Sequence, residues 1–395
     1  MSAARPASLL DHFSALKDPR QRWRVVYPLP EILLLVLCAT LSGMEDFTEV
    51  RLWGDERLDF LRRFLPYERG LPSHDTLNDV INGLDTELFK SCFATWVETL
   101  REAEPEIVCI DGKTSRRCHA RGKGREALHM VSAWASRQRL VLGQEAIDEK
   151  SNEIKAIPLL LERLELRGAL VTIDAIGTQT EIAQAVVARG GDYLLGLKAN
   201  QPALLEDVAD FFADPPPDML ESAHETVDGD HGRIEERRHV VCHDVKWLTK
   251  DRSASGARLA GLSLIGMVET RVEREGAIAR ERRYYISSAN LDAETFAAAV
   301  RTHWHVENRL HWVLDVVFHD DLARLRTGNG PANMAVIRHM AMNLIRNPKD
   351  KHSLKNRRKL ANLNTAYLEA LIRNPAPLRA PRRIIESKSG APASD

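Results

Sequence analysis

The sequence has almost no net charge, no closely paired cysteines and no internal repeat. Its 55 Lys and Arg residues balance 56 Asp and Glu residues, giving a formal charge of −1. The overall basic excess that marks many nucleic-acid-binding proteins is therefore missing. The cysteines follow neither CxxC nor zinc-ribbon spacing, so we expect free thiols in a reducing cytoplasm; they are Cys38, Cys92, Cys109, Cys118 and Cys242.

The chain also lacks a segment suited to the membrane. Its most apolar run, ILLLVLCATLSGM (residues 32–44), is shorter than the roughly 20 residues that span a bilayer. Residues 1–21 lack the continuous apolar stretch of a secretory signal. We therefore expect a globular protein without a membrane partner, in which residues 32–44 form a buried helix. Its 395 residues suffice for two or three domains.

Residues 1–104 are predicted to form a helical domain. After Ser73, a plausible N-cap, the sequence carries two helices that divide near Gly83. Two helices joined by a short turn permit a DNA-reading helix-turn-helix, but such pairs are common in any helical domain. The helix pair alone therefore leaves both interpretations open.

From residue 105 onward the pattern changes to alternating strands and helices. Three β-rich runs come first, followed by a helix with Pro158 in its first turn, a strand, a second helix and a strand. The order β-β-β-α-β-α-β predicts a mixed α/β sheet, with a hairpin meander leading into crossover units. The strands are EIVCID, LHMVSAWAS, RLVLGQEAI, ALVTID and DYLLGLK.

Residues 201–284 interrupt this order with a β-rich insertion. Three runs in it, RIEERRHVVCHD, LSLIGMVETRVE and ARERRYYISSA, alternate like antiparallel strands. A helix from about Ala293 to Phe318 follows, so residues 285–347 are expected to complete the α/β core of residues 105–200. Residues 348–395 are expected to form a basic, partly disordered tail, in which KDKHSLKNRRKL is the basic run and the final SKSGAPASD is disordered.

Three acidic residues are the candidates for chemistry. Asp111 ends EIVCID and Asp174 ends ALVTID, the position where α/β sheets usually place their active sites. Two carboxylates on neighbouring strands need a proton or a divalent cation between them, and oxygen ligands favour Mg²⁺ or Mn²⁺. Glu307 on the late helix is placed to complete the cluster. His303, Glu307, His311 and Asp315 share one helical face, whereas Trp304 is expected to pack on another.

Each candidate also has a plain structural interpretation. Asp111 and Gly112 form a common hairpin-turn signal, Asp174 lies where it would cap a helix, and Glu307 alone is an ordinary solvated glutamate. Zinc bound by His303, Glu307 and His311 is a further alternative, although the spacing is not HExxH.

Six segments carry a family resemblance. They resemble, in consistent order over roughly residues 8–347, the H-repeat-associated (ISAs-type) transposases of bacterial insertion sequences. The segments are CIDGKTSR, VTIDAIGTQTEIA, DYLLGLKANQ, HGRIEERR, RYYISS and HWHVENRLHWVLDVVFHDD. The resemblance implies a ribonuclease-H-like fold of the retroviral-integrase type and an Asp-Asp-Glu catalytic triad of Asp111, Asp174 and Glu307. It also implies a helical N-terminal domain, residues 1–104, that helps to bind the element's ends.

The implied activity is DNA transposition. Mg²⁺ held by the triad, with Mn²⁺ able to substitute, would support hydrolysis at the element's ends and transfer of the 3′-hydroxyl into target DNA. The partners would be double-stranded DNA, both terminal inverted repeats and target, and a second copy in a homodimer on DNA. Such a protein would be cytoplasmic and nucleoid-associated when bound. A nuclease that does not transpose, or a DNA-binding protein that has lost activity, are the alternatives.

Further residues are candidates for positioning DNA or the metal ligands. His303, His311 and Asp315 surround Glu307 on its helix. The wider group often has Tyr, Arg and Lys flanking the third carboxylate, where this chain has Val300, His303 and Leu314. Basic segments in a neutral chain suggest phosphate contacts and a salt-dependent affinity for DNA. The DNA-contact candidates are Lys113, Arg116, Arg117, Lys198, Asn200, Gln201, Arg301, Arg309, Arg357 and Arg358.

Overall fold

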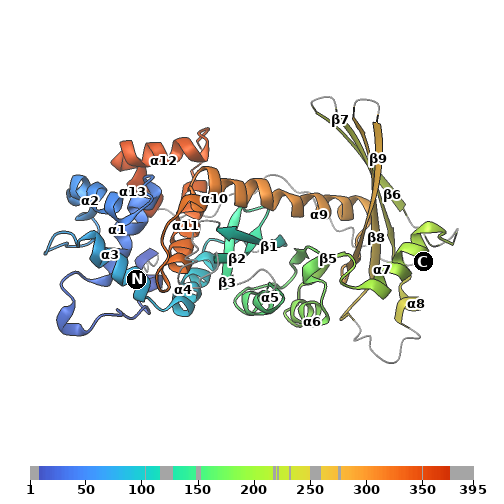
Figure 1. Ribbon diagram of the computed structural model, residues 1–395, viewed down its shortest axis with the longest axis horizontal. Coiled ribbons are helices and arrows are strands. Elements are labelled where there is room, and N and C mark those ends of the chain that lie inside the picture. Colours follow the sequence, from blue (N-terminus) through green and yellow to red (C-terminus); the bar gives the residue numbers. More distant parts are fainter. Residues whose placement is uncertain are drawn as a thin grey trace, which may run out of the picture.

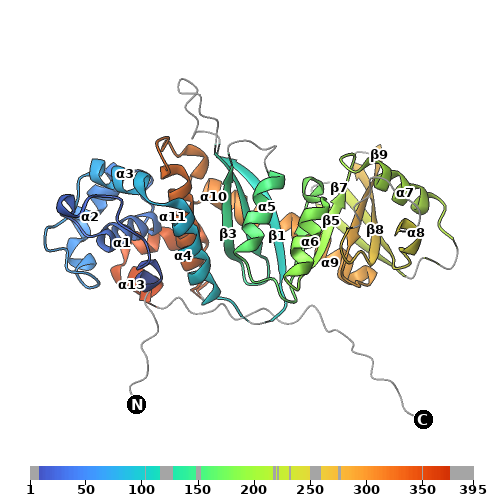
Figure 2. The same cartoon turned by 90° about the horizontal axis from the view of Figure 1, so that it is seen from below.

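The computed structural model is an elongated molecule with helices at one end and a sheet that extends to the other (Figures 1 and 2). It describes residues 9–102, 104–115, 128–147, 153–216, 219, 222–230, 233–249, 259–274, 277–348 and 350–373. Among these residues, no helix combines the length and the apolarity needed to cross a membrane.

The N-terminal region is helical, as the sequence predicts. Short 3₁₀ turns η1 (Leu9–Phe13) and η2 (Arg22–Arg24) precede helices α1 (Leu29–Leu41), α2 (Phe47–Leu61), α3 (His74–Gly83) and α4 (Thr86–Glu98). The apolar run forms α1, whose side chains are almost all buried. Ser73 caps α3, because its hydroxyl accepts a hydrogen bond from the Thr76 N–H.

The C-terminal part of the chain folds back onto these helices. Helix α11 (Gly330–Arg346) packs against α1, α3 and α4, while α12 (Leu354–Leu363) and α13 (Thr365–Arg373) lie beside it. In Figure 1 the red C-terminal helices and the blue N-terminal helices form one body. The basic run after Asn347 is therefore helical over most of its length, and residues 374–395 of the expected tail lie outside the described range.

Within the described residues, nine strands form one sheet in the order β3-β2-β1-β4-β5-β9-β8-β7-β6. The first five are β1 (Ile107–Ser115), β2 (Leu128–Ala135), β3 (Leu140–Ile147), β4 (Leu170–Ile173) and β5 (Asp192–Leu197). Strand β1 pairs antiparallel with β2 and parallel with β4, and β4 pairs parallel with β5. The predicted meander and crossover order is thus confirmed.

The segment between β5 and the last long helix extends the same sheet. It contains α7 (Pro202–Ala213), β6 (Ser222–Asp230), β7 (Arg233–Cys242), α8 (Lys246–Thr249), β8 (Leu264–Arg274) and β9 (Ala277–Ser287). Strand β9 pairs antiparallel with β5, which joins the inserted strands to the core. The sequence predicted three of these four strands and missed β6, a polar strand at the sheet edge.

Helices cover both faces of the sheet. Helices α5 (Glu153–Glu162) and α6 (Thr180–Ala188) pack on one face, and α9 (Ala293–Val306) crosses the other, contacting β1, β4, β6 and β7 (Figure 1). Helix α5 begins five residues before Pro158, so this proline lies inside the helix rather than in its first turn. The register of the sheet beneath α9 positions the candidate site.

The predicted late helix spans three segments. Helix α9 continues into a π-helical turn, η6 (Glu307–His311), and then into α10 (Trp312–Val316); a 3₁₀ turn, η7 (Asp320–Leu322), follows. The predicted limits near Ala293 and Phe318 agree with this, but the π-helical turn was not foreseen. Such turns insert an extra residue and often occur at functional sites.

Candidate active site

Asp111 and Asp174 lie side by side, each directly after the last residue that pairs between two parallel strands. Ile110 of β1 is the register partner of Ile173 of β4, so the next residue on each strand is an aspartate. Neighbouring strands are about 4.8 Å apart. The sequence predicted that Asp111 would be the last residue of its strand. Strand β1 instead continues to Ser115 through its pairing with β2.

Asp174 serves as a cap as well as a site candidate. Its carboxylate accepts a hydrogen bond of 3.1 Å from the Ile176 N–H at the start of the 3₁₀ turn η5 (Ala175–Gly177). The side chain is exposed. The structural interpretation of this residue therefore holds, and it leaves the second carboxylate oxygen facing solvent.

Glu307 lies at the end of α9, the helix that crosses one face of the sheet, and reaches Asp111 from that face. It opens the π-helical turn η6 at the end of α9, and its side chain is 63% exposed. One Glu307 carboxylate oxygen lies 3.4 Å from Nδ1 of His311, and that nitrogen lies 3.6 Å from a carboxylate oxygen of Asp111. Ligand atoms of these three residues all lie within 4.8 Å of one another.

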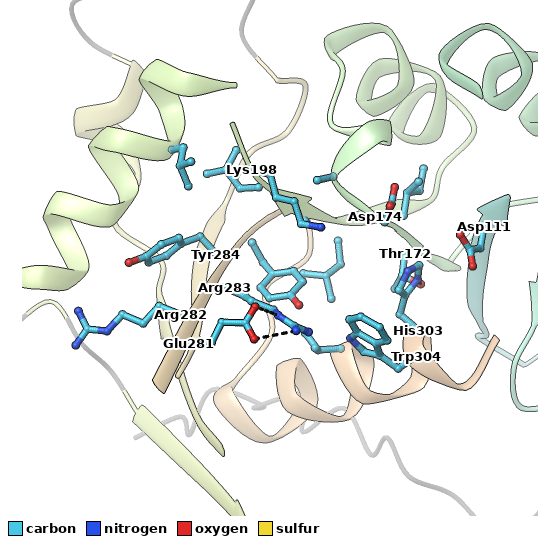
Figure 3. Close-up of a pocket in the computed structure, with 18 of the residues that line it drawn as sticks. Asp111, Thr172, Asp174, Lys198, Glu281, Arg282, Arg283, Tyr284, His303 and Trp304 are labelled. Carbon is cyan, nitrogen blue, oxygen red and sulfur yellow. Dashed lines mark hydrogen bonds and ion pairs between the residues drawn. The ribbon is translucent and has the colours of Figure 1, made fainter. Parts of the chain in front are cut away.

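All three carboxylates line one cavity of about 510 Å³. Figure 3 shows Asp111 and Asp174 on adjacent strands, with His303 and Trp304 of α9 facing them. Lys198 extends from the end of β5 toward the same cavity, and Arg282 and Arg283 of β9 lie on its far side. The cavity is thus acidic at one end, and the other end carries Lys198 with two arginines that are paired, Arg283 with Glu281 and Arg282 with Glu269.

Burial, together with the negative charges of Asp174, Glu307 and Glu153, raises the pKa of the Asp111 carboxyl to about 7. A hydrogen bond from the Gly112 N–H opposes this shift but does not cancel it. A carboxyl whose ionised form is disfavoured by burial and by like charges is a natural position for a cation.

His303 is held away from the carboxylates. Its Nδ1 lies 3.0 Å from the Thr172 hydroxyl, and burial lowers the pKa of its imidazole. Among the described residues, the cluster that could hold a metal here contains His311 with Asp111 and Glu307, and includes neither His303 nor Asp174. The zinc site of His303, Glu307 and His311 considered from the sequence therefore does not form.

Lys113 points into a second acidic cluster. Its ammonium nitrogen lies 2.7 Å from Asp315, 3.1 Å from Asp321 and 3.4 Å from Asp320. Burial alone would lower the pKa of Lys113, but the three carboxylates outweigh it and the pKa is raised. Lys113 is thus engaged with protein carboxylates rather than open to a phosphate, and Asp315 pairs with Lys113 rather than with Glu307.

Arg357 and Arg358 are internal. The Arg357 guanidinium binds Asp350 and the carbonyls of Ile345 and Arg346. Arg358 donates to the carbonyls of Val317 and Thr40, and both arginines are less than 10% exposed. The structure corrects their assignment to DNA contact, because their charges complete the junction between α12 and the rest of the helical body.

The remaining DNA candidates differ in their exposure and in the partners that they bind. Lys198 and Arg301 are exposed, and Arg301 forms an ion pair of 3.0 Å with Asp228. Asn200 and Gln201 donate to the carbonyls of Ala175 and Thr178, so they shape the loop beside Asp174. Arg309 is half-buried, and burial lowers the pKa of its guanidinium. Arg116 and Arg117 lie outside the described residues.

Trp304 was expected in the core, but it lies open at the cavity. Its side chain is 51% exposed, and the Arg283 guanidinium carbon lies 5.0 Å from the ring centroid. Sequence reasoning missed both residues as site candidates. The signal was present in the run RERRYY, where alternate residues of β9 face α9.

The predicted helix pair, α3 and α4, has little positive charge on its surface. The exposed side chains on it include Asp75, Asp79, Glu87 and Glu98, and Lys90 is buried in ion pairs with Glu87 and Glu145. Acidic side chains repel the phosphate backbone. This disfavours a DNA-reading role for the pair.

Comparison with known proteins establishes the family. Residues 102–344 match the transposase DDE domain family, and residues 10–97 match the DDE_Tnp_1-associated family. The chain is 37% identical to the H repeat-associated putative transposase YhhI of Escherichia coli (strain K12), over 92% of this chain and 97% of that one. It is 38% identical to the putative transposase YncI of Escherichia coli O157:H7, over 92% and 94%.

The chain therefore belongs to the transposase DDE domain family, and the resemblance to H-repeat-associated transposases is confirmed. A solved piggyBac transposase synaptic complex with hairpin DNA aligns at 12% identity with a TM-score of 0.37, covering 92% of this chain and 80% of that one. This likeness is too low to bear on the fold.

Proposed function

We propose that this protein is an active DNA transposase whose Asp111, Asp174 and Glu307 form its catalytic triad. The observation that carries the proposal is that three carboxylates from β1, the end of β4 and the end of α9 line one cavity. The strand order β3-β2-β1-β4-β5, with β2 antiparallel to β1, supports a ribonuclease-H-like core in residues 105–200 and 285–347.

The site fits a divalent cation. Asp111 is mostly buried beside two further carboxylates, an arrangement that a cation would relieve and that hard ions such as Mg²⁺ prefer. We propose Mg²⁺, with Mn²⁺ able to substitute, bound by Asp111, Asp174 and Glu307. Such an ion supplies Lewis-acid stabilisation of the phosphoryl oxygens and activates water.

The reaction proceeds in two displacements at phosphorus. In the first, water attacks the phosphodiester at the element's end, the P–O3′ bond breaks, and a free 3′-hydroxyl and a 5′-phosphate result. In the second, that 3′-hydroxyl attacks a phosphodiester of the target and displaces its 3′-oxygen. The triad would hold the cation in both steps, and no covalent protein intermediate is needed because water and the 3′-hydroxyl are the nucleophiles.

DNA approaches along the cavity rim. A second cavity of about 780 Å³ adjoins the first, and Arg283, Trp304 and Glu307 line both. Lys198 supplies positive charge, whereas Arg283 is paired with Glu281 at 2.8 Å, and the exposed Trp304 ring offers a face for stacking. We propose that this continuous surface holds the strand that is cut. Joining two element ends further predicts a homodimer on DNA, working on the chromosome in the cytoplasm.

Single substitutions test the triad. Asp111→Asn, Asp174→Asn and Glu307→Gln should each abolish cleavage of a labelled element-end duplex in Mg²⁺ while retaining binding of that duplex. Glu181→Gln, an exposed carboxylate in the first turn of α6, is the matched control and should cleave normally. Normal cleavage by any triad variant would refute that residue's role.

A strand-transfer assay separates the alternative functions. Joining of the labelled 3′ end to plasmid DNA identifies a transposase. Nicking without joining identifies a nuclease, and binding without either identifies a DNA-binding protein that has lost activity.

A further inference from the structure

His311 is buried yet faces the carboxylates of Asp111 and Glu307. Its side chain is 6% exposed, and its Nδ1 is directed at Asp111 and Glu307. Its other ring nitrogen, Nε2, has no hydrogen-bond partner among the described residues. A buried imidazole between two acids needs a physical reason.

The distances do not suit hydrogen bonds. A charge-assisted N–H···O bond measures about 2.7–2.9 Å, whereas Nδ1 lies 3.4 Å from Glu307 and 3.6 Å from Asp111. Two ligands bound to one ion at about 2.1 Å each are separated by about 3.0 Å at a right angle and by about 3.4 Å at a tetrahedral angle. Mg²⁺ and Mn²⁺ are octahedral, so the right-angle value applies to them, and the observed spacings exceed it by about 0.4–0.6 Å, a gap that small side-chain rotations close.

The local fold explains why His311 reaches this position. It closes the π-helical turn that Glu307 opens, so the two residues belong to one irregular turn. Asp111 enters from β1 on the other side, at a point where the strand pairing with β4 has ended. Three side chains from two elements thus converge within 4.8 Å.

We infer that His311 is a nitrogen ligand of one metal ion in the catalytic site, together with Asp111 and Glu307. This inference rests on the proposed function, because it adds a ligand to the metal site proposed there. An imidazole ligand shifts affinity toward Mn²⁺ and other transition metals, since Mg²⁺ prefers oxygen. The site would therefore bind Mn²⁺ more tightly than an all-carboxylate site does.

Pulsed electron paramagnetic resonance on the Mn²⁺-loaded full-length protein tests the ligand directly. The wild type should show modulation from a directly bound ¹⁴N nucleus. His311→Gln keeps much of the side-chain volume and an oxygen donor, so it should still bind Mn²⁺ but lose the ¹⁴N modulation. His303→Gln, a cavity histidine bonded to Thr172, is the matched control and should retain it.

Metal titrations give a second readout. His311→Gln should weaken Mn²⁺ binding about tenfold or more and change Mg²⁺ binding much less. Mn²⁺ that binds in an Asp111-dependent manner without ¹⁴N modulation would overturn this inference and leave the proposed function intact. Modulation that persists in His311→Gln would also overturn it. A wild type that binds no Mn²⁺ would overturn both proposals.

Discussion

Removing the charge of Asp111 should stabilise the metal-free protein at neutral and alkaline pH. The structure raises the pKa of this carboxyl from 3.8 to about 7, chiefly through burial and then through Asp174 and Glu307. Between these two values the folded protein holds a proton that the unfolded chain has lost. The stabilisation of the folded state by this proton is fully present below pH 3.8 and is lost as the pH rises through 7.

The expected gain follows from the size of this shift. At about 1.4 kcal/mol for each pH unit, a change from 3.8 to about 7 corresponds to an upper limit of about 4 kcal/mol. The exposed partners Asp174 and Glu307 can turn into solvent, so we expect Asp111→Asn to raise the free energy of unfolding by about 1–3 kcal/mol at pH 8. At pH 5 the gain should shrink by more than half.

Urea unfolding in EDTA, monitored by circular dichroism at pH 5 and pH 8, measures this difference. Glu307→Gln, with its exposed side chain, is the comparison and should give a smaller gain. Adding Mg²⁺ should stabilise the wild type and narrow its gap to Asp111→Asn, because only the wild type binds the ion well. The reasoning is wrong if Asp111→Asn is less stable than the wild type at pH 8, or if the gap is equal at both pH values.

Three other predictions concern DNA binding and the helical body. Trp304→Ala should weaken binding of an element-end duplex by about 1–3 kcal/mol in a fluorescence-anisotropy titration. An unchanged Kd would show that Trp304 does not contact the DNA. Binding by the wild type should weaken steeply from 50 to 200 mM salt; a flat dependence would contradict phosphate contact. Arg358→Met should cost about 2–4 kcal/mol in urea unfolding, because it removes two buried hydrogen bonds, to the carbonyls of Thr40 and Val317. The exposed Arg62→Met should cost less than about 0.5 kcal/mol, and equal costs would show that Arg358 is not structural.

The sequence predicted what depends on local pattern. The buried strands before Asp111 and Asp174, the limits of the late helix and the Ser73 cap each follow from short-range periodicity and capping chemistry. The pairing of Ile110 with Ile173 requires only that β1 and β4 be neighbours, and the predicted element order supplied that.

Features set by distant parts of the chain were not predictable in the same way. Arg358 appears as part of a basic run, yet it is buried because carbonyls from α1 and from the end of α10 accept its hydrogen bonds. Lys113 follows a site aspartate but turns toward acids about 200 residues later. Trp304 has the pattern of a core residue, but the inserted strands bring Arg283 to its ring and leave a cavity beside it.

Anomalous scattering from crystals grown with Mn²⁺ tests the central claim most directly, because it locates the ion among the carboxylates. We predict a Mn²⁺ peak at the tip of β1, about 2.1–2.4 Å from oxygens of Asp111 and from at least one of Asp174 and Glu307. Crystals with no ion at Asp111, or with Mn²⁺ only in the cluster of Asp315, Asp320 and Asp321, would contradict the account.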